Sequence, residues 1–189
     1  YPHTIVDDSD RLITPSCQFI FYYLSFFVKI SDISVILENS KLKEITMVNK
    51  VAWITGAGSG IGEASAIKLS EEGFIVVLSG RTKEALDTVA SKCEGRASVK
   101  PLDVSNSEDV KGVFNNIISD YGRIDVLVAS AGLNAKNRNW HNVSDEDFDQ
   151  IIKIDLNGVF YTNRLVLEKM KEQREGLIIN ISSWAGRYV

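Results

Sequence analysis

The chain has 189 residues, of which 44% are hydrophobic and 24% charged, values that are ordinary for a globular domain with a buried core. They exclude a disordered or collagen-like chain. With 21 Lys and Arg against 25 Asp and Glu, the net charge of −4 disfavours nucleic acid or an anionic membrane as the main partner. Cys17 and Cys93 have no second Cys or His at ligand spacing. The sequence therefore indicates neither a disulfide framework nor a metal site, and it favours a cytoplasmic location.

The composition changes near residue 47. All 13 glycines lie at or after Gly56, whereas 7 of the 17 aromatic residues lie within the first 46 residues. The apolar run 19–28 is shorter than the roughly 18 residues that a membrane span needs, and acidic residues precede it where a signal peptide carries cations. We interpret residues 1–46 as an N-terminal extension outside the functional fold, translated upstream of a start at Met47. The alternative is a hydrophobic extension that packs on the body or on a partner.

From Met47 onward, apolar runs alternate with helical patterns. The predicted strands cover 51–55, 74–78, 97–104, 124–129 and 177–181, and the predicted helices cover 61–69, 82–92, 105–121 and 144–170. The last two helices begin with capping boxes, Ser105-x-x-Glu108 and Ser144-x-x-Asp147. Continuous apolar strands are typical of a parallel sheet that is buried on both faces. The pattern predicts an α/β fold with a doubly wound parallel sheet, in which ligands bind beyond the carboxyl ends of the strands.

A glycine-rich segment, Thr55-Gly56-Ala57-Gly58-Ser59-Gly60-Ile61-Gly62, follows the first predicted strand. Glycines at 56, 60 and 62 permit a tight turn, close approach of the backbone to a pyrophosphate, and close packing of helix on sheet. No Lys follows at Walker-A spacing, so the segment is not a nucleoside triphosphatase loop. At the junction of a strand and a helix, it predicts dinucleotide binding.

This spacing resembles that of the short-chain dehydrogenase/reductase superfamily, whose signature Thr-Gly-x-x-x-Gly-x-Gly is met in full. Three further motifs match in order. Leu102-Asp103-Val104 is similar to the strand end that contacts adenine, Ala131-Gly132 to the second half of Asn-Asn-Ala-Gly, and residues 179–186 to the segment with the catalytic serine. The resemblance covers 47–189. It implies a Rossmann-fold NAD(P)-binding domain and hydride transfer between the nicotinamide cofactor and a small-molecule carbonyl or alcohol, and a homo-oligomer for the complete protein.

The resemblance also implies a set of site residues. Ser183 would hydrogen-bond the substrate oxygen, and Asp155 replaces an asparagine of the family's long helix. The spacing of Asp155 places it on the buried stripe of that helix, where a carboxylate without a basic partner should have a raised pKa or face a polar pocket. The alternative is a tolerated variant at a bend near Gly158. The expected cofactor-binding residues are Thr55, Gly56, Gly58, Ser59, Gly60, Ile61, Gly62, Arg81, Asp103, Val104, Ser130, Ala131 and Gly132.

The end of the second predicted strand, Ser79-Gly80-Arg81, indicates the cofactor. NAD enzymes place a carboxylate there for the ribose 2′-hydroxyl. Here Gly80 leaves room for a 2′-phosphate and Arg81 can bind it, so we expect NADP as the preferred cofactor and NAD as a second that the site accepts. An Arg81 that is merely solvated is the alternative. The missing carboxylate also disfavours a methyltransferase on the same kind of sheet.

The family's proton donor, Tyr-x-x-x-Lys, does not occur in these residues. Tyr188 is too close to Ser183 to match it and has no Lys four residues later. We therefore expect the chain as given to be truncated before this motif, with an incomplete sheet, and to be unable to turn over substrate. A nucleotide-binding module or inactive fragment is the alternative to an oxidoreductase.

Overall fold

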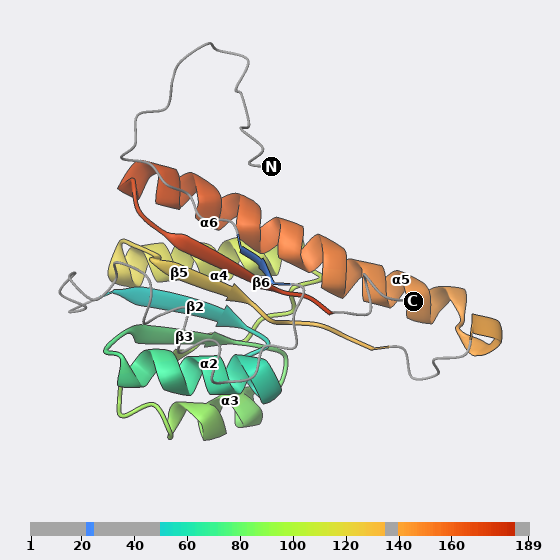
Figure 1. The fold of residues 1–189 in the computed structure, drawn as a ribbon, viewed down its shortest axis with the longest axis horizontal. Coiled ribbons are helices and arrows are strands. Elements are labelled where there is room, and N and C mark those ends of the chain that lie inside the picture. The colour runs from blue at the N-terminus through green and yellow to red at the C-terminus, as the bar shows by residue number, and fades with distance from the viewer. Residues whose placement is uncertain (1–21, 25–49, 135–139, 184–189) are drawn as a thin grey trace, which may run out of the picture.

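The structure is a computed structural model that describes residues 22–24, 50–134 and 140–183. One parallel sheet runs through the molecule, with helices on both of its faces (Figure 1). The strands are β1 (Tyr22–Leu24), β2 (Val51–Thr55), β3 (Ile75–Ser79), β4 (Ala97–Val99), β5 (Val126–Ala129) and β6 (Leu177–Ile181). The helices are α2 (Gly60–Glu71), α3 (Lys83–Ala90), α4 (Ser107–Tyr121), η2 (Trp140–Asn142), α5 (Asp145–Ile151), η3 (Ile152–Gly158) and α6 (Val159–Gln173).

The strand order is β1-β6-β5-β2-β3-β4, and every neighbouring pair is parallel. From β2 the chain proceeds through β3 to β4 on one side, then crosses back to β5 and β6 on the other. The predicted doubly wound sheet is confirmed. Its strand order reverses beside β2, and the crevice at such a reversal is where ligands bind in these folds.

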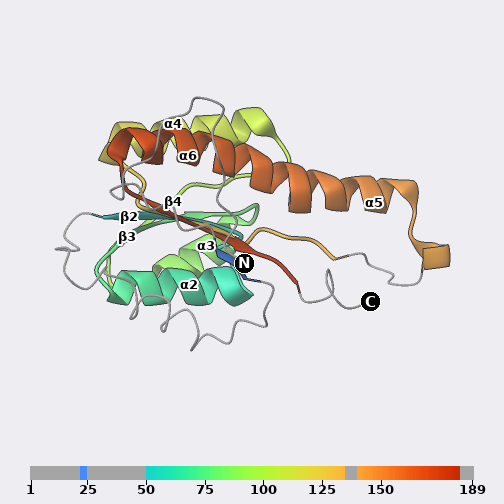
Figure 2. The ribbon, with the colours of Figure 1, turned by 45° about the horizontal axis from the view of Figure 1, so that its top comes forward.

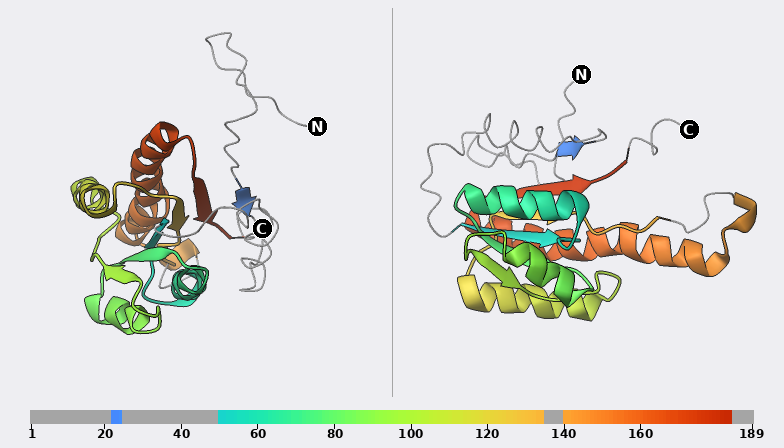
Figure 3. Two further views of the ribbon diagram at one scale, coloured as in Figure 1. Left: turned by 90° about the vertical axis from the view of Figure 1, so that its left-hand side faces the viewer. Right: turned by 90° about the horizontal axis from the view of Figure 1, so that it is seen from below.

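Strand β1 adds a sixth, edge strand that the sequence did not predict. Tyr22 pairs with Ile179 and Leu24 with Ile181 of β6, and Figure 3 shows the two strands side by side. Three residues of the N-terminal extension 1–46 therefore pair with the edge of the sheet. The other residues of that extension lie outside the described part of the chain, and its separation from the functional fold stays a prediction.

Helices cover both faces of the sheet (Figure 2), and an apolar core lies between the helices and each face. On one face, α2 and α3 bury Leu69 and Leu86 around Ile54 of β2. On the other, α4 and α6 bury Ile117 and Met170 around Trp53. All five residues of β2 are buried because alternate side chains enter opposite cores. The sheet is thus a fixed platform for the loops at its carboxyl end.

Two predicted boundaries around β4 and α4 are wrong. Strand β4 ends at Val99, not Val104, although Leu102 N still donates to Gly80 O at 2.9 Å. Helix α4 is capped by Asn106, whose Oδ1 accepts from Glu108 N at 3.0 Å. The predicted cap, Ser105, instead donates from Oγ to Asp103 Oδ1 at 2.7 Å. Because the Ser105 hydroxyl is hydrogen-bonded to Asp103, the helix cap lies one residue later than predicted, at Asn106.

The long helix predicted from Ser144 is present as the continuous sequence α5, η3 and α6, which extends past the carboxyl ends of the strands (Figure 1). Its predicted cap is confirmed, since Ser144 Oγ accepts from Asp147 N at 3.1 Å. Segment η3 is a π-helix, an irregularity that often marks functional sites. A Cβ on Gly158 would lie 2.8 Å from Val104 Cγ2, so this glycine lets the helix approach the segment after β4.

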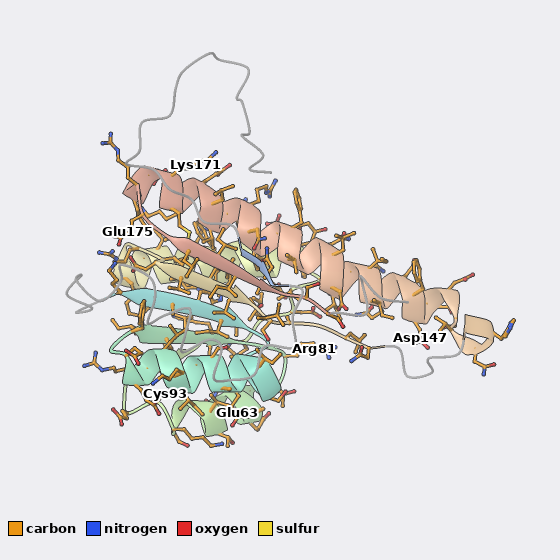
Figure 4. All side chains as sticks on the ribbon, viewed as in Figure 1. Glu63, Arg81, Cys93, Asp147, Lys171 and Glu175 are labelled. Carbon is orange, nitrogen blue, oxygen red and sulfur yellow. The ribbon has the colours of Figure 1, made fainter. Side chains whose placement is uncertain are left out.

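Polar side chains at the amino end of the sheet pair with one another. Asp125 Oδ2 accepts from Val51 N and from Arg123 Nε, both at 2.8 Å. Lys50 Nζ lies 2.5 Å from Glu175 Oε1. These bonds join the starts of β2, β5 and β6. Figure 4 shows Glu175 at this end and Arg81 at the opposite one.

Candidate cofactor-binding site

A cavity of about 280 Å³ opens at the carboxyl ends of β2, β3 and β5. Its walls come from the glycine-rich loop after β2, the start of α3, the segment after β4, the loop after β5, and η3. The lining residues are Gly56, Gly58, Ser59, Gly80, Arg81, Thr82, Ala85, Leu86, Leu102, Asp103, Val104, Ala131, Gly132 and Ile154. The cavity therefore lies where the strand order reverses.

Two glycines of the loop are required by close packing. Gly56 has φ of +65°, and a Cβ on it would lie 2.7 Å from both Ala131 N and Ser130 O. A Cβ on Gly62 would lie 2.2 Å from Gly56 O. Gly62 does not line the cavity, so it acts by letting α2 pack against the loop. This matches the packing role predicted from the motif.

The amino end of α2 faces the same loop. The helix begins at Gly60, directly after the cavity-lining Ser59, whose side chain makes no capping hydrogen bond. The first N–H groups of a helix have no partner within it and carry a partial positive charge. Together with the loop glycines they provide donors suited to a pyrophosphate.

Thr55 holds the β5 loop against the glycine loop. Its buried Oγ1 accepts from Ser130 N at 3.2 Å and from Ala131 N at 3.3 Å. Thr55 and Ser130 do not line the cavity themselves, and neither do Gly60 and Ile61. Of these, Thr55 and Ser130 fix the position of the loops, and Gly60 and Ile61 form the start of α2.

The β3 side of the cavity carries its positive charge. Arg81 and Thr82 follow β3 directly, and Arg81 is exposed (Figure 4). In the described part of the chain, no salt bridge involves Arg81. Asp103 faces the same side, but its Oδ1 already accepts from Ser105 N at 2.9 Å and from Ser105 Oγ. Arg81 is thus the available charged group at this end.

Asp155 lies on η3, where the cavity meets the β5 loop. Its Oδ1 accepts from Leu133 N at 2.8 Å. The prediction that Asp155 lies on the buried stripe is wrong. Its side chain is exposed and the neighbouring Ile154 is buried, because the wider π turn rotates the helix faces away from the α-helical spacing. Desolvation by the surrounding protein raises the pKa of Asp155, and the Leu133 hydrogen bond opposes that rise.

Ser183 follows β6 at the same edge of the sheet and is exposed. It does not line the cavity. Behind it, Asn163 Nδ2 of α6 donates to Asn180 Oδ1 of β6 at 3.0 Å, which ties the end of the strand to the long helix. The two predicted catalytic residues therefore lie at the same end of the sheet, on its β5 and β6 side.

Sequence reasoning missed four of the residues that line the cavity. Three of them belong to the start of α3 and its cap, and they carry no motif of their own. The signal that could have found them is position, because α3 begins at the carboxyl end of a central strand. The fourth adjoins Asp155 on η3. The missed residues are Thr82, Ala85, Leu86 and Ile154.

No described helix combines the length and the apolar character that crossing a membrane requires. No cluster of three or more His, Cys, Asp or Glu side chains suited to a metal ion occurs among the described residues.

A crevice at the reversal of a doubly wound sheet, lined by a glycine loop and a helix amino terminus, defines a dinucleotide-binding α/β protein. Comparison with known proteins places it more narrowly. Residues 50–189 match the model of the family described as short chain dehydrogenase. The chain belongs to the short-chain dehydrogenase family.

Relatives and solved structures agree with this assignment. The chain is 39% identical over 142 residues to the 3-oxoacyl-(acyl-carrier-protein) reductase FabG of Thermotoga maritima, covering 74% of this chain and 57% of that protein. A metagenomic short-chain oxidoreductase in complex with NADP matches with a TM-score of 0.72 at 32% identity, over 77% of this chain and 67% of that one. The 3-ketoacyl-(acyl-carrier-protein) reductase of Brucella melitensis complexed with NADH gives 0.70 at 35% identity, over 75% and 61%. The chain thus spans less than two thirds of the length of the curated relative.

Proposed function

We propose that this chain binds NADP(H) in the cavity between β3 and β5, as the cofactor domain of an oxidoreductase that interconverts a carbonyl and an alcohol. The observation that carries the proposal is the cavity itself. Gly56, Gly58 and Ser59 of the family's glycine signature line it. Arg81 lies at the β3 end, with no carboxylate at that strand's end. A relative crystallised with NADP and one with NADH support a nicotinamide cofactor.

The lining residues suggest how the cofactor would lie. Leu86 and Leu102 provide an apolar surface for the adenine, and Arg81 can donate to a 2′-phosphate. The loop 56–62 and the start of α2 would hold the pyrophosphate. The remaining half of the cofactor would then extend over Gly132 toward β6. NADP is the preferred cofactor. NAD also fits the cavity, but it lacks the 2′-phosphate that Arg81 would contact.

The chemistry would take place on the β5 and β6 side. Bound NADPH supplies a hydride for the carbonyl carbon. Ser183 would donate a hydrogen bond to the carbonyl oxygen, where negative charge develops in the transition state. The 189 residues contain no Tyr-x-x-x-Lys to supply the proton. We therefore expect this chain to bind cofactor while catalysing carbonyl reduction about 10²–10⁴-fold more slowly than a chain with a positioned acid.

Self-association and a cytoplasmic location complete the proposal. Leu156 and Phe160 on the long helix are 60% and 58% exposed, and Phe148 lies on the same helix with its ring also exposed. Large exposed apolar side chains grouped on one element often mark a protein interface. They support a homo-oligomer for the complete protein.

The test is a calorimetric titration of the 189-residue chain with NADPH, NADP⁺, NADH and NAD⁺. We expect saturable binding of all four, with the phosphorylated pair tighter by at least about tenfold, as for a hydrogen bond between charged groups. An absence of saturable binding would overturn the proposed function. Equal affinities for NADPH and NADH would overturn the preference for NADP.

A further inference from the structure

The carboxylate of Asp155 lies directly beside the β5 wall of the cavity. Its Oδ1 accepts from Leu133 N at 2.8 Å, and a Cβ placed on Gly132 would lie 3.8 Å from the same oxygen. Gly132 and Ile154, the residues preceding Leu133 and Asp155, both line the cavity. A negative charge is therefore fixed at this wall by the backbone of the loop.

Within the described residues, no basic side chain forms a salt bridge with Asp155. The Leu133 N–H is a neutral donor and leaves the net charge in place. Desolvation by the surrounding protein raises the pKa of the carboxyl, and the Leu133 hydrogen bond opposes that rise.

The order of the strands decides which half of the cofactor meets this charge. Arg81 and Leu102 lie at the β3 and β4 side, the glycine loop lies at β2, and Gly132 lies at β5. A dinucleotide with its adenosine phosphate at Arg81 and its pyrophosphate on the loop must place its nicotinamide half on the β5 side. Asp155 and the nicotinamide ring therefore share one end of the crevice.

We infer that the Asp155 carboxylate makes the site selective for the oxidation state of the cofactor, binding NADP⁺ more tightly relative to NADPH than an uncharged side chain would. This rests on the proposed function. The nicotinamide ring carries a positive charge in NADP⁺ and none in NADPH, which differs from it by one hydride. A fixed negative charge stabilises the first and leaves the second nearly unaffected.

The exposure of the Asp155 side chain limits its influence on the relative affinities for NADP⁺ and NADPH. Solvent and salt screen interactions between charges that are in part exposed. We expect Asp155 to shift the ratio of the two dissociation constants about fivefold toward NADP⁺. Because a tenfold ratio corresponds to 29.6 mV for a two-electron couple, this lowers the reduction potential of the bound cofactor by about 20 mV. Bound NADPH thereby becomes a slightly stronger hydride donor.

The experiment measures the dissociation constants of NADP⁺ and NADPH for the 189-residue chain and two variants, by calorimetry at low ionic strength. Asp155→Asn removes the charge but keeps an oxygen that can accept from Leu133 N. Asp149→Asn removes an equal charge from an exposed position on α5, outside the cavity lining. Circular dichroism and thermal unfolding of each variant establish that it is folded.

We expect Asp155→Asn to change the ratio of dissociation constants about fivefold in favour of NADPH, and added salt to reduce that change. Asp149→Asn should leave the ratio as it is in the unchanged chain. If both nucleotides bind to folded Asp155→Asn with an unaltered ratio, the inference is overturned while the proposed function stands. If neither nucleotide binds to the unchanged chain, the proposed function fails and the inference with it.

Discussion

The two ends of the parallel sheet use polar side chains in opposite ways. At the amino end, Asp125 accepts from Val51 N and Arg123, and Lys50 pairs with Glu175, so the groups satisfy one another. At the carboxyl end, Arg81 and Asp155 have no salt bridge among the described residues. The Ser59 side chain does not cap its helix, and Asp155 accepts from the backbone N–H of Leu133. The first end is arranged to hold strands together.

The carboxyl end of the sheet leaves hydrogen-bond donors and charged side chains available to a ligand. Sequence alone does not separate these two uses, because the identity of a charged residue does not show whether its partner lies on a neighbouring strand. The difference comes from the sheet, whose parallel strands bring all their carboxyl ends to one edge. Substitutions of the paired side chains at the amino end should therefore change stability and leave nucleotide affinity intact, and substitutions of exposed charged side chains at the carboxyl end, such as Arg81, should do the reverse.

The largest effect on stability is expected from Asp125→Ala. It leaves the buried Val51 N–H without an acceptor, which costs about 1–3 kcal/mol, and it also removes the partner of the half-exposed Arg123. We expect the free energy of unfolding to fall by about 3 kcal/mol in urea denaturation. Asp125→Asn, which can still accept from Val51 N, should lose clearly less. A weakened affinity of the folded variant for NADPH would contradict the division between the two ends.

At the carboxyl end, Arg81→Ala should weaken NADP⁺ binding by about 1.5–3 kcal/mol, the contribution of a hydrogen bond to a charged group. NAD⁺ binding and the free energy of unfolding should change little, since Arg81 is exposed. The charge-matched control is Lys111→Ala on the exposed side of α4. Equal losses for both nucleotides, measured by calorimetry, would show that Arg81 does not bind the 2′-phosphate.

Gly62→Ala tests the packing beneath the loop. The added Cβ would lie 2.2 Å from Gly56 O, so the loop must move, at about 1–3 kcal/mol of stability and with weaker binding of every nucleotide. The matched control is Gly112→Ala in α4, where no atom lies within 4 Å of the new Cβ. That variant should become more stable by up to about 1 kcal/mol, because Ala favours a helix over Gly. Thermal unfolding with and without NADPH separates the two outcomes.

The smallest expected effect is the pH dependence due to Asp155. Its pKa in the folded chain is raised above the ordinary value of 3.8, so folding favours the protonated form. The contribution of Asp155 to stability therefore falls as the pH rises from 3.8 to the folded pKa, and is constant above it. The difference in unfolding free energy between the unchanged chain and Asp155→Asn should decline over that window. A difference that grows with pH would mean that the carboxylate is stabilised by the fold.

Much of the fold and of the glycine loop could be predicted from the sequence, because continuous apolar strands and a signature at a strand end each have few structural solutions. The position of Asp155 could not, since the π segment 152–158 breaks the spacing from which its burial was inferred. The capping of α4 by Asn106 was not predicted, because the Ser105 hydroxyl bonds to Asp103 instead of to the helix. A capping-box pattern does not include this local contact. The pairing of β1 with β6 joins residues more than 150 positions apart, and three residues carry no periodicity to predict it.

We propose that the carboxyl end of the sheet binds NADP with its adenosine phosphate at β3. The most direct measurement is competition against NADPH on the 189-residue chain by the two halves of the cofactor, adenosine 2′,5′-bisphosphate and nicotinamide mononucleotide. The adenosine half meets Arg81, Leu102 and the glycine loop, so it should displace NADPH, and Arg81→Ala should weaken that displacement. The nicotinamide half alone should compete poorly. Displacement by nicotinamide mononucleotide but not by the bisphosphate would contradict the account.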